Sequence, residues 1–130
     1  MWDYRAKLIE VHDGDTIKLL IDNGLGSRQE EAIRLKGVFA PELSQPGGPE
    51  TRDFVETYLS NNMQHDFKWP LHVVTEPNQS PEPTEIRTFT RYVGVVKVYS
   101  SYVLFTPTPL NKVINEFLAQ HPEWGKGIGG

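Results

Sequence analysis

The sequence predicts an α+β fold: a five-stranded β-barrel with two or three packed helices. Three observations support this prediction. Apolar and polar residues alternate with a period of two along most of the first forty residues and again along residues 91–99, while residues 50–61 and 110–121 have the longer period of amphipathic helices. The resulting order is β-β-β-α-β-β-α with short strands, which is typical of a small barrel such as the OB-fold.

Residues 4–11, 16–22 and 32–36 are expected to form three consecutive antiparallel strands, with Asn23-Gly24 and Gly26 in the turn between the last two. Together they make a meander.

Two further β-rich segments follow, at residues 67–74 and 91–99. The second has apolar residues on both faces, which predicts a central strand. Residues 75–84 lie between the two segments and contain three prolines, so we expect a mobile loop there.

The two helices have recognisable beginnings. Pro49 suits the first position of a helix over residues 50–61, because its fixed φ and missing N–H cost nothing there. Thr108 and Pro109 are expected as the N-cap and first residue of the second helix, which ends before Pro122. Both helices carry an apolar face suited to packing on the sheet: Phe54, Val55, Tyr58 and Leu59 in the first, and Leu110, Val113, Ile114, Phe117 and Leu118 in the second.

The composition fits one domain, predicted at residues 1–124 and followed by a flexible glycine-rich tail at 125–130. The chain has 130 residues, 38% of them hydrophobic, no cysteine and a net charge of −4. Disulfides and thiolate metal sites are therefore excluded. No apolar stretch is long enough to span a membrane, and the N-terminus lacks an apolar signal region. We expect a monomeric, cytoplasmic protein of a bacterium or of a phage-infected cell.

Three groups of residues are candidates for chemistry: Asp13-Gly14-Asp15-Thr16, Arg34 with Pro41-Glu42, and Arg91. Each has an ordinary structural explanation. An Asp-Gly-Asp segment can simply reverse the chain, because Asp bonds its own backbone and Gly accepts a positive φ. An isolated arginine in a strand is usually solvated.

In combination, these groups resemble the staphylococcal nuclease (thermonuclease-like) family in residue type, spacing and flanking sequence. The similarity covers roughly residues 8–119. It comprises Val11, Asp13-Gly14-Asp15-Thr16, Arg34-Leu35-Lys36-Gly37-Val38, Ala40-Pro41-Glu42, Gly48, Glu50, Arg91-Tyr92-Val93-Gly94 and Leu110-Asn111.

The resemblance implies a calcium-dependent endonuclease that cuts DNA and RNA and leaves 3'-phosphate ends. Asp15 corresponds to a metal-ligand aspartate, and Ala40 to a position whose backbone carbonyl faces the metal. Glu42 corresponds to the glutamate that activates water, while Arg34 and Arg91 correspond to the arginines that hold the phosphate. These roles are chemically reasonable, because guanidinium groups bind phosphate oxygens bidentately and hard divalent cations prefer oxygen ligands.

One position departs from the family pattern. Phe39 stands where active members commonly have a second metal-binding aspartate, so calcium could bind less tightly or give way to another divalent cation. Asp13 could replace the missing ligand or could only shape the turn, and His12 is expected at an exposed strand end. The alternative function is a weakened or inactive nuclease-like barrel that binds nucleic acid or protein, and an exposed Phe39 beside Arg34 would favour it.

Two aromatic residues are candidates for contact with the nucleotide. Phe89 lies just before Arg91, and Trp124 lies close to where the family has a base-stacking tyrosine. For Trp124, packing within the protein is the alternative.

Overall fold

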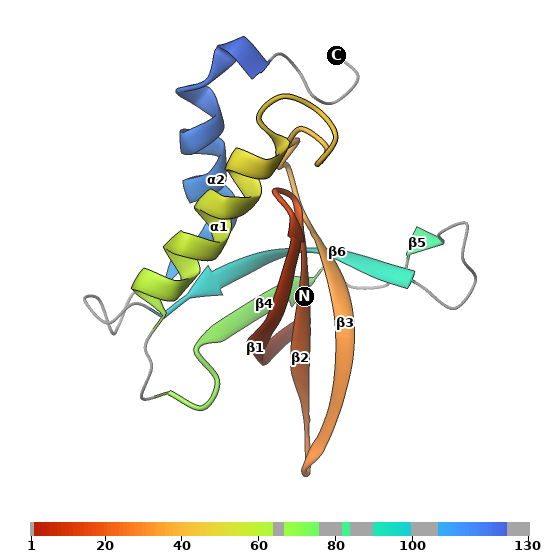
Figure 1. Cartoon of the computed structure of the whole chain (residues 1–130). Coiled ribbons are helices and arrows are strands. Elements are labelled where there is room, and N and C mark those ends of the chain that lie inside the picture. The colour runs from red at the N-terminus through yellow and green to blue at the C-terminus, as the bar shows by residue number, and fades with distance from the viewer. Residues whose placement is uncertain (1, 64–66, 76–81, 84–89, 100–106, 125–130) are drawn as a thin grey trace.

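The computed structural model describes residues 2–63, 67–75, 82–83, 90–99 and 107–124. Five strands form a closed barrel of mixed direction, and two helices lie side by side against one side of it (Figure 1). The structure confirms the predicted α+β, OB-fold-like architecture. The expected glycine-rich tail and Phe89 fall outside the described residues.

The meander is formed by β1 (Trp2–Asp13), β2 (Thr16–Gly24) and β3 (Ser27–Leu35), which pair antiparallel in sequence order. Strand β4 (Leu71–Thr75) pairs antiparallel with β1 and with β6 (Thr90–Val98). A parallel pairing of β3 with β6 closes the ring. The predicted central position of β6 is therefore confirmed.

The barrel interior is filled by side chains at alternate strand positions, which is why the period of two was visible in the sequence. Ile17 and Leu19 are fully buried, and Ile33 is nearly so. Helix α1 (Gly48–Asn62) adds Val55 and Leu59 to this core, and helix α2 (Leu110–Ala119) adds Leu110 and Ile114.

The two helices also contact each other. The rings of Phe54 and Phe117 stack with centroids 4.0 Å apart. A short 3-10 helix, η1 (Pro122–Trp124), follows α2 and is the third helical element. None of the helices in the described part of the chain is long and apolar enough to cross a membrane.

Some details differ from the sequence-based expectations. Thr108 is not a helix cap: Thr108–Pro109 form a short strand, β7, on the edge of β6, and Pro109 itself occupies the cap position without a side-chain hydrogen bond. The predicted strand at 67–74 starts only at Leu71. Within the expected proline-rich loop, Glu82–Pro83 form another short strand, β5, also paired with β6.

Candidate functional site

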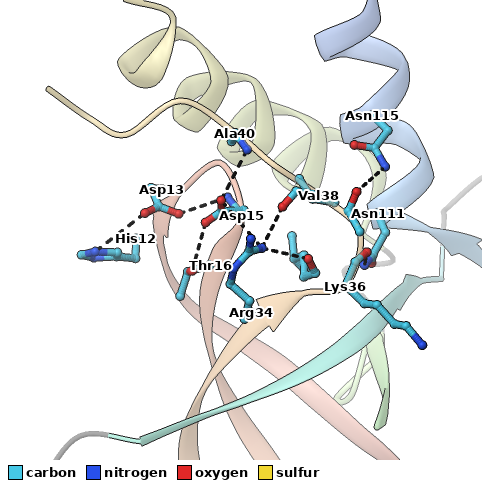
Figure 2. Close-up of polar contacts among 12 residues, drawn as sticks. His12, Asp13, Asp15, Thr16, Arg34, Lys36, Val38, Ala40, Asn111 and Asn115 are labelled. Carbon is cyan, nitrogen blue, oxygen red and sulfur yellow. Dashed lines mark hydrogen bonds and ion pairs between the residues drawn. The ribbon is translucent and has the colours of Figure 1, made fainter. Parts of the chain in front are cut away.

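The turn between β1 and β2 fixes the first candidate carboxylates. The backbone N–H of Asp15 donates to Asp13 Oδ1 at 3.0 Å, so Asp13 shapes the turn as the ordinary explanation expects. The Asp15 side chain makes separate bonds. Its Oδ1 accepts from the Thr16 hydroxyl at 3.2 Å, and its Oδ2 accepts from the backbone N–H of Ala40 at 3.4 Å (Figure 2).

Gly14 is required here for a reason that the sequence did not reveal. The φ of Gly14 is not positive, so the turn does not need glycine for its backbone conformation. Instead, an added Cβ would lie 2.5 Å from Thr51 Cγ2 and 2.6 Å from Ala40 Cβ. The turn is thus packed directly between the first turn of α1 and the segment that carries Ala40, which holds Asp15 against that segment.

The Asp15 carboxyl has an unusual proton affinity. Burial and the neighbouring Asp13 raise its pKa from 3.8 to about 6, although Arg34 and the Ala40 N–H favour the ionised form. When the Asp13 and Asp15 carboxyls are both ionised, the site carries more negative charge than Arg34 balances. A bound cation would supply that charge.

Arg34, near the end of β3, lies next to this carboxylate. Its Nη1 is 3.7 Å from Asp15 Oδ2 and donates to the carbonyls of Leu35 at 3.1 Å and Val38 at 2.7 Å. These bonds fix the guanidinium in place. Its remaining N–H groups donate to none of the residues that the structure describes.

Phe39 is 56% exposed, and the Arg34 guanidinium carbon lies 5.5 Å from its ring centroid. This is a cation–π distance. The position that lacks the expected carboxylate therefore presents an exposed aromatic ring beside the candidate phosphate-binding arginine.

Arg91 is placed by its backbone. In the parallel pairing of β3 with β6, Arg91 lies opposite Ala32, two residues before Arg34, and Val93 lies opposite Arg34. The barrel closure therefore brings the two candidate arginine positions onto neighbouring strands, although they are far apart in the sequence.

Glu42 lies in the segment between β3 and α1. Its backbone N–H donates to the Gln45 side chain at 2.8 Å, and its carbonyl accepts from the Gln45 N–H at 2.9 Å. The residue is exposed, and its carboxylate has no hydrogen-bond or ion-pair partner among the described residues.

Asn111 holds the segment after β3, a role that sequence reasoning missed. Its buried amide donates to the carbonyls of Lys36 at 2.8 Å and Gly94 at 3.2 Å and accepts from the Val96 N–H at 3.1 Å. Asn115, one turn later, donates to the Gly37 carbonyl at 3.1 Å (Figure 2). An asparagine between Leu110 and Ile114 on a buried helix face was the signal available in the sequence.

Trp124 and His12 have contacts of their own. The Trp124 ring stacks on His121 with centroids 4.1 Å apart and also contacts Phe117. Any Cβ at Gly47 would overlap the Trp124 indole, so this ring packs on the N-cap of α1. His12 is exposed, as expected, with Nε2 3.9 Å from Asp13 Oδ2.

The oxygen donors beside Arg34 fit a hard divalent cation in kind. Asp15 offers a carboxylate and Asp13 a second one close by, whereas the observed contact of Ala40 with Asp15 is made by its N–H and not by its carbonyl oxygen. In the described part of the chain, no three acidic or histidine side chains gather into a ligand cluster, so water would have to complete the coordination sphere.

A relative of this chain would share the order and spacing of these residues and their positions in the barrel. No protein-family model matches this chain, and no curated protein matches it.

Proposed function

We propose that this chain is a metal-dependent endonuclease that hydrolyses phosphodiester bonds of DNA or RNA and leaves 3'-phosphate ends. The observation that supports this best is the pairing of a fixed guanidinium with a carboxylate of raised pKa: Arg34 Nη1 lies 3.7 Å from Asp15 Oδ2. The similarity of the surrounding motifs to the staphylococcal nuclease family supports the same proposal.

Each residue has a role that follows from its chemistry. The free N–H groups of Arg34 bind two oxygens of the phosphate, and Arg91, on the neighbouring strand, donates to the same group. Both stabilise the negative charge that develops on those oxygens during attack. The exposed carboxylate of Glu42 orients the attacking water and accepts its proton.

Asp15 and the backbone carbonyl of Ala40 would hold the divalent cation, with Asp13 as a further oxygen donor. When bound, calcium or another divalent cation polarises the phosphoryl group. The raised pKa of Asp15 means that a proton competes with the cation for this carboxylate near pH 6.

One observation favours a second candidate function, binding without cleavage. Phe39 is 56% exposed beside Arg34, and this position provides no ligand for a metal. An aromatic ring next to a phosphate-binding group is suited to stack on a nucleobase. In this alternative, the barrel holds a nucleic-acid strand and its metal site has lapsed.

Cleavage of fluorescent single-stranded DNA and RNA distinguishes the two functions. The natural chain, Glu42→Gln and Phe39→Asp are assayed with calcium, with magnesium or manganese, and with a chelator. Metal-dependent cutting by the natural chain that disappears in Glu42→Gln supports the nuclease. Binding without cutting, with activity gained only in Phe39→Asp, supports the binding module.

A further inference from the structure

A cluster of cations surrounds one indole ring, on a different part of the barrel from Asp15. Lys7 Nζ and Arg28 Cζ each lie 5.5 Å from the ring centroid of Trp69, and Lys68 Nζ lies 5.9 Å from it. Lys7 belongs to β1 and Arg28 to β3, while Lys68 and Trp69 precede β4. We call these four residues the Trp69 cluster. Three separate segments thus place their charges around one aromatic ring.

Within the described part of the chain, the charges of the Trp69 cluster are not neutralised by close ion pairs. Among the described residues, no carboxylate forms an ion pair with Lys7, Arg28 or Lys68. Asp22, opposite Arg28 in the strand register, forms its ion pair with Arg5 at 2.7 Å. After the Gly24 N–H and Arg5, Arg28 makes only the smallest contribution to the lowered pKa of this carboxyl. Like charges held together repel one another, and a polyanion relieves that repulsion. Such a concentration of cations stands out in a chain whose net charge is −4.

The Trp69 cluster shares a strand face with the candidate phosphate site. Arg28 and Arg34 are six residues apart on β3 in a continuous register, so they lie on the same face at a separation of roughly 20 Å. Between them, the negative charge of Glu30 is partly offset by an ion pair with Lys18 at 3.2 Å. At the rise of about 3.4 Å per phosphate of a fully stacked strand, as in B-form DNA, this separation corresponds to about six nucleotides.

We propose that the Trp69 cluster is a second binding surface for a polynucleotide, which contacts one stretch of a strand while Arg34 holds another. Lys7, Arg28 and Lys68 bind the phosphates, and the half-buried indole of Trp69 holds these three cations together. The inference rests on the proposed function for the nature of the ligand, and it is independent of whether that ligand is cleaved.

The test is fluorescence anisotropy of labelled dT4 and dT12 with the full chain in chelator, so that no metal-dependent cutting takes place. Arg28→Glu is compared with Lys112→Glu, which makes the same change of charge at an exposed position on α2. We expect Arg28→Glu to weaken dT12 binding at least tenfold and Lys112→Glu less than threefold. The slope of log K against log salt for dT12 should become shallower by about 0.7 for each phosphate that the variant no longer neutralises.

Equal weakening by Arg28→Glu and Lys112→Glu would overturn the proposal, because only net charge would then matter. So would equal competition by poly-glutamate of the same total charge. Lys68→Glu serves as a second variant if Arg28→Glu unfolds, and quenching of fluorescence that disappears in Trp69→Phe locates the strand at the indole.

The two proposals fail in different ways. Metal-dependent cleavage with no specific effect of Arg28→Glu would support the nuclease proposal and contradict the proposal of a second binding surface. Tenfold weaker binding in Arg28→Glu without any cleavage by the natural chain would support the second binding surface and contradict the nuclease proposal. Arg34→Ala should weaken dT4 and dT12 binding alike, whereas Arg28→Glu should weaken dT12 far more than dT4.

Discussion

Arg34 and Asp15 face each other at 3.7 Å without a close ion pair, because the arginine Nη1 is bonded to two backbone carbonyls, at 3.1 and 2.7 Å. The guanidinium is therefore held by two backbone carbonyls in addition to its attraction to the carboxylate. The two carbonyl bonds remain when Asp15 is protonated, because they do not involve its carboxyl group.

Replacement of Arg34 by lysine should abolish most of the activity while leaving the charge unchanged. An ammonium group cannot bond the Leu35 and Val38 carbonyls and also present a planar pair of donors to phosphate. We expect kcat/KM to fall by about 10²-fold or more, in line with the removal of one donor to a developing oxyanion. Steady-state cleavage of a labelled oligonucleotide measures this. A lysine variant with full activity would show that Arg34 supplies charge alone.

Asp15→Asn should change the pH dependence of stability. The pKa of the Asp15 carboxyl is about 6 when folded and near 3.8 when unfolded, so folding takes up a proton between these pH values. The natural chain then loses stability as pH rises from about 4 to 6 and does not regain it at higher pH. At 1.36 kcal/mol per pKa unit, the decrease is about 2–3 kcal/mol.

The measurement is urea denaturation of both proteins in chelator at pH 4, 6 and 8. Because asparagine does not titrate, the stability of Asp15→Asn relative to the natural chain should increase by that amount between pH 4 and 8. Asp13→Asn should reduce the pH effect by removing one of its causes. Parallel curves for the natural chain and Asp15→Asn would show that the carboxyl titrates normally.

Calcium should stabilise the natural chain against heat at pH 7.5, and the effect should shrink at pH 5, where the Asp15 proton competes. A ligand that binds only the folded state adds about 2.7 kcal/mol at a concentration of 100 Kd. Thermal melts with 0 and about 10 mM calcium, a range chosen so that the concentration exceeds a weak Kd, test this. Phe39→Asp should enlarge the shift and Asp15→Asn should abolish it. An equal shift in all three proteins would place any bound calcium elsewhere.

Asn111→Ala should destabilise the fold by about 2–4 kcal/mol, because the Val96 N–H and the carbonyls of Lys36 and Gly94 lose their amide partner. Asn115→Ala is the matched control: its single bond is exposed and should be worth less than about 1 kcal/mol. Denaturant unfolding measures both. Similar destabilisation in the two variants would mean that the buried amide is no more important than the exposed one.

Much of the barrel could be predicted from local pattern. Ile17 and Leu19 alternate with polar residues because one face of their strand is buried, and that alternation is visible in a short window. The Thr108 prediction was wrong because residues 108–109 pair with Val98 and Lys97, and a local window cannot contain that partner. The two-residue strand at Glu82–Pro83 escaped prediction for the same reason.

The residue types of the candidate site could be predicted from the sequence, but the contacts that hold these residues in place could not. Asp15 and Arg34 are recognisable by motif, and the structure places them together. The need for Gly14, however, comes from Thr51, and the bonds of Asn111 reach Lys36 across most of the chain. Exposure of Phe39 could not be read from the sequence either, because the short segment around it has no periodicity that would tell which way the ring points.

The parallel pairing of β3 with β6 also sets the order in which the site can be assembled. The β1–β2–β3 meander joins residues close in sequence, whereas Ala32 and Arg91 pair across about sixty residues. Pairings between sequence neighbours form fast, and closure of a long loop is slow. During folding, the turn with Asp15 and the strand with Arg34 can therefore come together early, while Arg91 arrives only when the ring closes. A nascent chain that ends before β6 already contains Asp15 and Arg34 of the candidate site but still lacks Arg91.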